Sequence, residues 1–209
     1  MNSFTISRTG TYLTVQDFGR FNYQHLGISP SGAMDHRILS ALNTIITKSE
    51  NQFLEFAYVG PSLKITEGAI KACVGGECKI FVQKQNNTQI EHKPYTSINL
   101  FEGDELTIHN TIDSVYGYIA IENGLGLQPC LNSYSTDTKA QIGSIPRPLQ
   151  IGDNFSIENK VSSWDLTFNN DIIIEKQCNF KVYPGPQMNF FGDETIQQFV
   201  STPYIITTQ

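Results

Sequence analysis

The 209-residue sequence has no long hydrophobic run and no basic patch, and each absence excludes a class of function. Its longest apolar runs, such as Tyr118 to Ile121, are far too short to span a bilayer, so no membrane association is expected. Acids and bases are interspersed at a formal net charge of −6, which argues against a nucleic-acid partner. The first residues lack the charged and apolar regions of a secretion signal, so the expected location is the cytoplasm.

Cysteine and histidine are also scarce, and their spacing matches no zinc site. Cys73 and Cys78 flank the segment VGGE, which is typical of a hairpin turn, so the two residues could face each other across two strands. A disulfide there is geometrically conceivable but disfavoured in a reducing cytoplasm. We therefore expect structural cysteines and no metal.

A nucleotide-binding loop is missing as well. Neither SPSGAMD nor VGGEC matches the pattern G-x-x-x-x-G-K-[ST], in which glycines and a lysine cradle phosphates. No ATP site can therefore be located on this chain from its residues.

The sequence does contain many short segments rich in β-branched and aromatic residues, separated by Gly, Asn, Pro or charged turns. Such a series predicts a mainly β fold, either a barrel or a sandwich. The expected strands are 4–9, 12–16, 53–60, 62–68, 69–74, 78–83, 96–101, 104–110, 115–122 and 154–159.

Two segments have helical periodicity instead. In MDHRILSALNTIITKS, residues 34–49, apolar side chains recur every three to four residues, and Ser31 or Asp35 can cap the start of the helix. A second, shorter helix is expected in GDETIQQFVS, residues 192–201. Residues 124–152 form a long stretch rich in turn residues, and such a stretch is usually functional or an interface.

The segment QDFGR contains a candidate catalytic pair. Asp17 could act as a base and Arg20 could hold a substrate carboxylate, with Gly19 allowing a tight bend between them. An ion pair that only staples the loop explains the same residues, and the sequence leaves both interpretations open.

Three other groups are equally ambiguous. The helix start at SPSGAMD offers N–H groups and the Ser29 and Ser31 hydroxyls to an anion, but capping explains them too. Glu55 lies between two apolar residues of a strand, so it is either a solvent-facing charge or, if the barrel interior is polar, a site acid. Residues 135–138 form a polar cluster that Asx and Ser/Thr turns also explain.

Several longer stretches together resemble one family: QDFGRFNYQHLGISPSGAMDHRILSALN, FLEFAYVGPSLKI, GYIAIENGLGLQPCLNSYSTDTKAQIG, RPLQIGD and VYPGPQMNFF. They are similar to the KipA-like or allophanate hydrolase subunit 2 family, also described as the C-subunit of 5-oxoprolinase and related to the carboxyltransferase domain of urea carboxylase. The resemblance runs in order from about residue 4 to the end of the chain.

The resemblance implies a cyclophilin-like β-barrel over residues 1–178 and the start of a second, truncated barrel over 179–209. It implies a non-autonomous subunit of an ATP-dependent amidohydrolase that opens the lactam of 5-oxoproline. The implied partners are a KipI-like B-subunit and a third lactam-hydrolase subunit, and a homo-oligomer is also possible. ATP would be used by the complex, and no metal or biotin is expected on this chain.

The positions that match the family motifs are expected to line or support the pocket. Catalytic roles fall on Asp17, Arg20 and Asp35. Substrate-binding roles fall on Ser31, Gly32, Ala33, Met34, Glu55, Ser135, Thr136, Asp137 and Gln187.

The chain also departs from the family pattern. Asn123 to Gly126 reads NGLG where the family usually has GGID, and Tyr134 replaces an expected Arg. Most of the second barrel is not represented after Gln209, so the strand, turn, helix and strand expected over 180–209 should pack back on the first barrel or swap with another copy. Two other functions stay open: a KipA-like regulatory protein that binds a KipI-like kinase inhibitor, and a vestigial domain without activity.

Overall fold

The computed structural model describes residues 1–46, 48–112, 114–158, 161–168 and 181–205. The chain divides into two compact units, Met1–Asn169 and Asn170–Gln209, and each is described by itself. In the described residues, no helix is both long and apolar enough to cross a membrane.

The first unit is mainly β, as predicted, with one α-helix among its described residues. Its helical elements are η1 (Gln24–Leu26) and α1 (His36–Ile45). Its strands are β1 (Asn2–Arg8), β2 (Thr14–Gln16), β3 (Phe53–Ala57), β4 (Ser62–Glu67), β5 (Ala69–Gly75), β6 (Cys78–Gln83), β7 (Gln89–His92), β8 (Ser97–Phe101), β9 (Glu105–Thr111), β10 (Tyr116–Ile121) and β11 (Asn154–Ile157).

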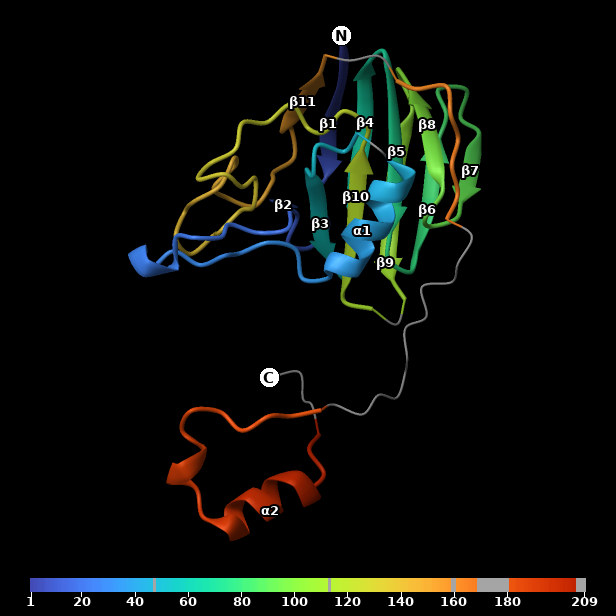
Figure 1. Cartoon of the computed structure of the whole chain (residues 1–209). Coiled ribbons are helices and arrows are strands. Elements are labelled where there is room, and N and C mark those ends of the chain that lie inside the picture. The colour runs from blue at the N-terminus through green and yellow to red at the C-terminus, as the bar shows by residue number, and fades with distance from the viewer. Residues whose placement is uncertain (47, 113, 159–160, 169–180, 206–209) are drawn as a thin grey trace. The chain divides into compact units, whose positions relative to one another are not determined.

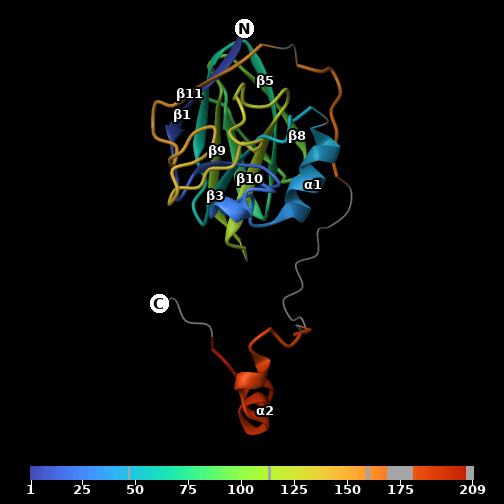
Figure 2. The same cartoon turned by 60° about the vertical axis from the view of Figure 1, so that its left-hand side comes forward.

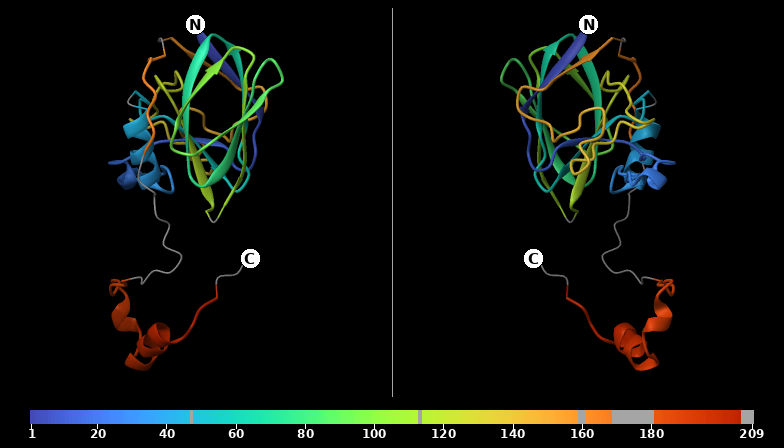
Figure 3. Two further views of the ribbon diagram at one scale, coloured as in Figure 1. Left: turned by 90° about the vertical axis from the view of Figure 1, so that its right-hand side faces the viewer. Right: turned by 90° about the vertical axis from the view of Figure 1, so that its left-hand side faces the viewer.

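The strands form two antiparallel sheets that face each other (Figures 1 and 3). The six-stranded sheet has the order β11-β1-β4-β9-β6-β7, and the five-stranded sheet has the order β2-β3-β10-β5-β8. Alternate side chains from both sheets meet in one apolar core that includes Phe4, Leu54, Ile80 and Ile119. Among the described strands no hydrogen-bonded pair joins the two sheets, so the fold is a two-layer β structure with a shared core.

Helix α1 covers the outer face of the five-stranded sheet (Figure 2). Its buried stripe, with Leu39 and Leu42 at its centre, packs on Phe53 and Tyr118 of the sheet. Gly75 lets the helix approach, because a Cβ at this position would lie 2.5 Å from Cγ2 of Ile38. The same face of the sheet therefore carries the start of α1 and the side chains that contact it.

All ten strands predicted for the first unit are present, and so are both predicted helices. The sequence misses β7, whose segment QIEH is almost entirely exposed. This strand lies at an edge of the six-stranded sheet, where one-sided pairing needs no apolar pattern.

The hairpin expected at VGGE is wrong. Strand β5 belongs to the five-stranded sheet and β6 to the six-stranded sheet, so the turn carries the chain from one layer to the other. Cys73 consequently packs under α1, whereas Cys78 lies in the core between the sheets. Both are buried free thiols, and burial raises the pKa of Cys78 to about 12.

The second unit contains η2 (Met188–Phe190) and α2 (Asp193–Ser201). The strands expected on either side of α2 are wrong for the described residues 181–205, where none is formed. A strand needs a hydrogen-bonded neighbour, and this part of the unit offers only helix and turn. The expected boundary at 178/179 lies outside the described residues, so the second barrel and its packing stay predictions.

Candidate functional site

Two glycines bring the loop after β2 against the loop before α1. Gly32 has a φ of 95°, and a Cβ on it would lie 2.9 Å from the Cα of Gly19. Gly19 itself has a φ of 109°. The Ala33 N–H donates to the Asp17 carbonyl oxygen at 2.9 Å across this contact. The spacing of glycines in the sequence thus reflects a close backbone approach that a side chain would block.

Asp17 is a buried carboxylate that holds the loop around residues 133–135. Its Oδ1 accepts from the Gly19 N–H at 2.8 Å, from the Ser133 hydroxyl at 2.9 Å and from the Ser135 hydroxyl. Its Oδ2 accepts from the Tyr134 N–H at 2.6 Å. These donors offset the cost of burying the charge, so Asp17 acts as the anchor of this loop.

Arg20 is fully buried and serves the same loop. Its Nη2 donates to the Ser135 carbonyl at 2.8 Å and its Nε to the Cys130 carbonyl at 3.3 Å. No ion pair joins Asp17 and Arg20 among the described residues, so the salt-bridge staple considered from the sequence is wrong. Both side chains instead bind residues 130–135: Asp17 accepts from side-chain and backbone donors, and Arg20 donates to two carbonyl groups.

Asp137 links this loop to the segment before α1. Its carboxylate accepts from the Ala140 N–H at 2.9 Å, the Lys139 N–H at 3.0 Å and the Ser31 hydroxyl at 3.3 Å. The hydrogen bond donated by the Ala140 N–H is the main cause that lowers the pKa of Asp137. Thr136, next to it, is buried. Capping of a turn therefore explains Asp137, whereas the Ser135 hydroxyl donates to Asp17 and the Thr136 hydroxyl donates to the Ile145 carbonyl at 2.8 Å.

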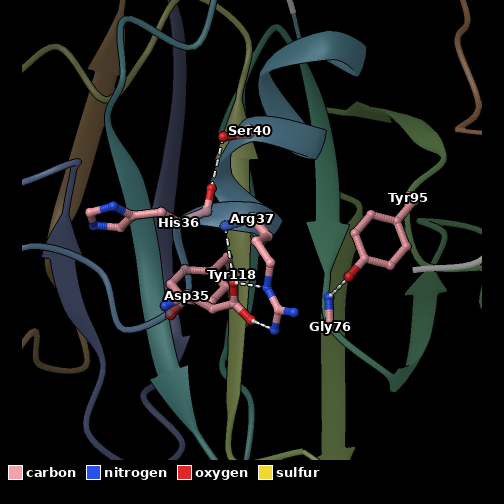
Figure 4. Close-up of polar contacts among 7 residues, drawn as sticks. All are labelled: Asp35, His36, Arg37, Ser40, Gly76, Tyr95 and Tyr118. Atoms are coloured by element: carbon pink, nitrogen blue, oxygen red, sulfur yellow. Dashed lines mark hydrogen bonds and ion pairs between the residues drawn. The ribbon is translucent and has the colours of Figure 1, made fainter. Parts of the chain in front are cut away.

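Asp35 is the N-cap of α1 and pairs with Arg37 (Figure 4). Its Oδ1 accepts from the Arg37 N–H at 2.9 Å, and Arg37 Nη2 lies 2.9 Å from Oδ2. The hydrogen bond from Arg37 lowers the pKa of Asp35. The Arg37 side chain is 77% exposed, so this ion pair presents a guanidinium at the protein surface.

Glu55 and Tyr118 meet beneath this helix start, on paired positions of β3 and β10. The Met34 N–H donates to Glu55 Oε2 at 2.8 Å, and the Asp35 N–H donates to the Tyr118 hydroxyl at 2.9 Å. Tyr118 in turn hydrogen-bonds Glu55. Burial raises the pKa of Glu55 and that of Tyr118. A carboxyl and a phenol therefore accept hydrogen bonds from two consecutive N–H groups.

Neither interpretation of Glu55 drawn from the sequence describes its position. Glu55 does point away from its neighbours Leu54 and Phe56, which lie in the core between the sheets. It faces the outer side of the sheet rather than a barrel interior, and the start of α1 partly covers it rather than leaving it in solvent.

The N–H groups expected to receive an oxyanion already have acceptors within the chain. The Ser31 N–H donates to the Ser29 hydroxyl at 3.2 Å, and the Ala33 N–H donates to the Asp17 carbonyl. Gly32 between them has a left-handed backbone that brings the two loops together. Capping, rather than an open anion site, is therefore the local structure here.

Sequence reasoning missed three side chains of this region: Arg37, Tyr95 and Tyr118. The Tyr95 hydroxyl accepts from the Gly76 N–H at 2.9 Å near the Asp35–Arg37 pair (Figure 4). The sequence could have indicated only Tyr118. This tyrosine lies on the face of β10 opposite the inter-sheet core, and a buried tyrosine hydroxyl needs a polar partner.

The structure groups the predicted site residues into two clusters in the first unit. The loop cluster comprises Asp17, Arg20, Ser31, Gly32, Ala33, Ser135, Thr136 and Asp137, and the helix-start cluster comprises Met34, Asp35 and Glu55. Gln187 is an exposed residue of the second unit.

Three curated relatives match long parts of the chain. It is 34% identical over 151 residues to the 5-oxoprolinase C-subunit of Haemophilus influenzae, covering 70% of this chain and 46% of that protein. It is 26% identical to the 5-oxoprolinase C-subunit of Escherichia coli, covering 98% of this chain and 64% of that protein. It is 28% identical to urea amidolyase of Saccharomyces cerevisiae, covering 94% and 11%. The chain thus spans less than two thirds of the length of each relative.

Solved structures agree with this similarity. The crystal structure of TTHA0988 superposes with a TM-score of 0.78 at 27% identity, covering 97% of this chain and 39% of that one. The Kluyveromyces lactis urea carboxylase gives a TM-score of 0.68 at 26% identity, covering 77% and 14%. The family described as carboxyltransferase domain, subdomain A and B, matches residues 26–209. The chain therefore belongs to this carboxyltransferase-domain family, as the motif resemblance predicts.

Proposed function

We propose that the chain is a subunit of an ATP-dependent 5-oxoprolinase-type amidohydrolase, which opens the lactam ring of 5-oxoproline. The observation that carries this proposal is the alignment of 98% of the chain with the protein named as the C-subunit of 5-oxoprolinase in Escherichia coli. A second protein with that name aligns at 34% identity. Both names describe a subunit, which supports partner chains, and for these we propose a KipI-like B-subunit and a third lactam-hydrolase subunit.

The helix-start cluster supports binding of a small carboxylate such as 5-oxoproline. Arg37 uses Nε and Nη2 on Asp35, and within the described part of the chain its Nη1 bonds no acceptor. A guanidinium that is oriented by one carboxylate and open on its other side can bind a second carboxylate. In this proposal Arg37 binds the substrate carboxylate and Asp35 orients Arg37.

The proton chemistry of lactam opening fits Glu55 and Tyr118. Opening the ring needs a proton for the departing nitrogen and a group that takes a proton from the attacking nucleophile. A carboxyl group whose pKa is raised by burial is closer to the operating pH than an exposed one. In this proposal Glu55 exchanges the proton, and the Tyr118 hydroxyl keeps the Glu55 carboxyl oriented toward the start of α1.

Asp17 and Arg20 contribute by position rather than by contact. Both are buried, and their hydrogen bonds hold the loop at 130–135 against the segment that leads into α1. Substitution of either would therefore displace the helix-start cluster. The proposal keeps both residues in the site as positioning residues.

ATP, which the complex would consume, does not fit the start of α1. A phosphate at a helix start needs unpaired N–H groups. Those of Met34, Asp35 and Arg37 already donate to Glu55, to Tyr118 and to the Asp35 carboxylate. We therefore place no step of ATP chemistry on these residues.

The test is reconstitution of the chain with its KipI-like partner and the third subunit, followed by measurement of ATP hydrolysis that depends on 5-oxoproline. Arg37→Ala is expected to raise the KM for 5-oxoproline at least about tenfold, since one charge-assisted contact is lost. Lys93→Ala is the matched control because it also removes one exposed cation.

Each outcome has a defined meaning. Turnover that depends on all three chains supports the enzyme function. Stable binding of the KipI-like partner without turnover would instead support the regulatory function. An unchanged KM in Arg37→Ala would remove the substrate role of this residue while leaving the subunit assignment intact.

A further inference from the structure

Residues 161–168, here called the strap, lie along the edge strand β8 of the five-stranded sheet (Figure 1, orange). The Ser97 N–H donates to the Leu166 carbonyl at 2.9 Å, and the Phe168 N–H donates to the Tyr95 carbonyl at 2.9 Å. The strap follows β11 and extends the sheet by an isolated bridge rather than by a regular strand.

Beneath the strap lies a buried lysine. The Lys71 side chain, on β5, is only 2% exposed, and its Nζ lies 3.2 Å from Asp165 Oδ1. Nζ also donates to the Ser162 hydroxyl at 3.4 Å and to the Trp164 carbonyl. All of these acceptors belong to the strap, so among the described residues the lysine depends on this one segment for its side-chain partners.

Three donors converge on the Asp165 carboxylate. Besides Lys71, Asn99 Nδ2 donates to Oδ1 at 2.8 Å and the Ser97 hydroxyl donates to it at 3.5 Å. Lys71 on β5 pairs with Asn99 on β8, and Ser97 lies on β8 two residues before Asn99. The donors are therefore fixed on two paired strands, whereas the carboxylate that they bind is on the strap and is 64% exposed.

The strap itself buries little apolar surface. Trp164 is 75% exposed and Leu166 is 42% exposed. Polar contacts thus hold the segment, among them the Ser162 N–H, which donates to Glu122 Oε2 at 2.8 Å. Segments held in this way open locally at a small fraction of the global unfolding free energy.

A pocket adjoins one of the three donors, Asn99. Its volume is ≈ 340 Å³, and its lining includes Ile70, Asn99 and Phe101 from the sheet and Val161 and Ser163 from the strap. This volume lies within the range of small-molecule sites. Asn99 belongs both to the pocket and to the set that binds the carboxylate, so a ligand could place its acid group on Lys71 and its body in the pocket.

We propose that Lys71, Asn99 and Ser97 form a second binding site for a small carboxylate, and that Asp165 occupies this site in cis as an exchangeable latch. The site lies on β5 and β8 and is separate from the helix-start cluster at Asp35. A carboxylate from solution takes the place of Asp165 on Lys71, and the strap around Trp164 is released. The inference does not depend on the proposed enzymatic function.

The test uses acetate as the probe and Trp164, the only tryptophan of the chain, as the reporter. In the wild-type chain, acetate is expected to lower the fluorescence anisotropy of Trp164 in a saturable way, while chloride at equal ionic strength does not. Asp165→Asn should lower the anisotropy without acetate. It should also bind acetate about tenfold more tightly, since the competing carboxylate is gone.

Two variants serve as controls. Lys71→Met should abolish acetate binding, and Asn99→Ala provides the same test if Lys71→Met does not fold. Glu102→Gln removes one exposed carboxylate elsewhere and should behave as the wild type. Equal acetate affinity in the wild type, Asp165→Asn and Asn99→Ala, or no acetate binding by Asp165→Asn, would overturn the proposal.

Discussion

The Tyr118 hydroxyl accepts the Asp35 N–H at 2.9 Å and hydrogen-bonds Glu55, so one phenol joins the start of α1 to the sheet below it. Tyr118→Phe removes this link and leaves the Asp35 N–H without its acceptor. We expect the free energy of unfolding to fall by about 1–3 kcal/mol, the cost of an unsatisfied buried group. Urea denaturation measures this loss, and Tyr12→Phe, at an exposed tyrosine, is the control. Equal stability of the two variants would contradict the link.

Glu55 makes stability depend on pH. Burial raises its folded-state pKa above the ordinary value of 4.5, so the folded protein binds this proton more tightly than the unfolded chain does. The stabilisation from the proton is complete below the ordinary pKa and is lost as pH rises through the folded pKa. Glu55→Gln lacks this titration.

The unfolding free energy of the wild type minus that of Glu55→Gln should therefore fall as pH rises across this window. Urea denaturation of both proteins at a series of pH values measures the difference. A difference that stays constant with pH, or that grows as pH rises, is incompatible with a buried carboxyl at this position.

Gly32→Ala should destabilise the contact between the two loops. The added Cβ would lie 2.9 Å from the Cα of Gly19, and the φ of 95° is strained for any residue with a side chain. We expect a loss of about 1–3 kcal/mol in unfolding free energy. Gly27→Ala is the matched control, because its φ is 76° and its Cβ would have no neighbour within 4 Å. A larger effect at Gly27 than at Gly32 would show that the contact is unimportant.

Asp17→Asn should weaken the loop at 133–135. The carboxylate accepts four hydrogen bonds, and an amide can replace only one of the two oxygens that receive them. We expect a loss of about 3 kcal/mol in unfolding free energy. Amide hydrogen exchange should also accelerate at Tyr134 and Ser135. Glu102→Gln is the control, and unchanged exchange at Tyr134 would argue against the anchor role.

Much of the fold follows from the sequence because its signals are local. Segments rich in β-branched and aromatic residues between turns mark ten of the strands, and the three-to-four spacing after Asp35 marks α1 with its cap. The paired glycines at 19 and 32 mark a turn-rich segment. Strand β7 escapes these signals because an exposed edge strand needs no apolar pattern.

The candidate site follows from the sequence only in part. The motifs include Asp17, Arg20, Asp35 and Glu55, but nothing local shows that the first two are buried anchors and the last two lie at the helix start. Tyr118 was missed because its role depends on the pairing of β3 with β10, which joins residues far apart in the chain.

The sequence by itself determined ten strands of the first unit, the helices and the family, because each depends on local composition, periodicity or contiguous motifs. Only the tertiary structure decided which sheet each strand joins, which side of the five-stranded sheet Glu55 faces and that Lys71 lies under Asp165. The physical reason is that burial and hydrogen-bond partners are set by packing between distant segments. A carboxylate or an ammonium group acquires its role from that packing.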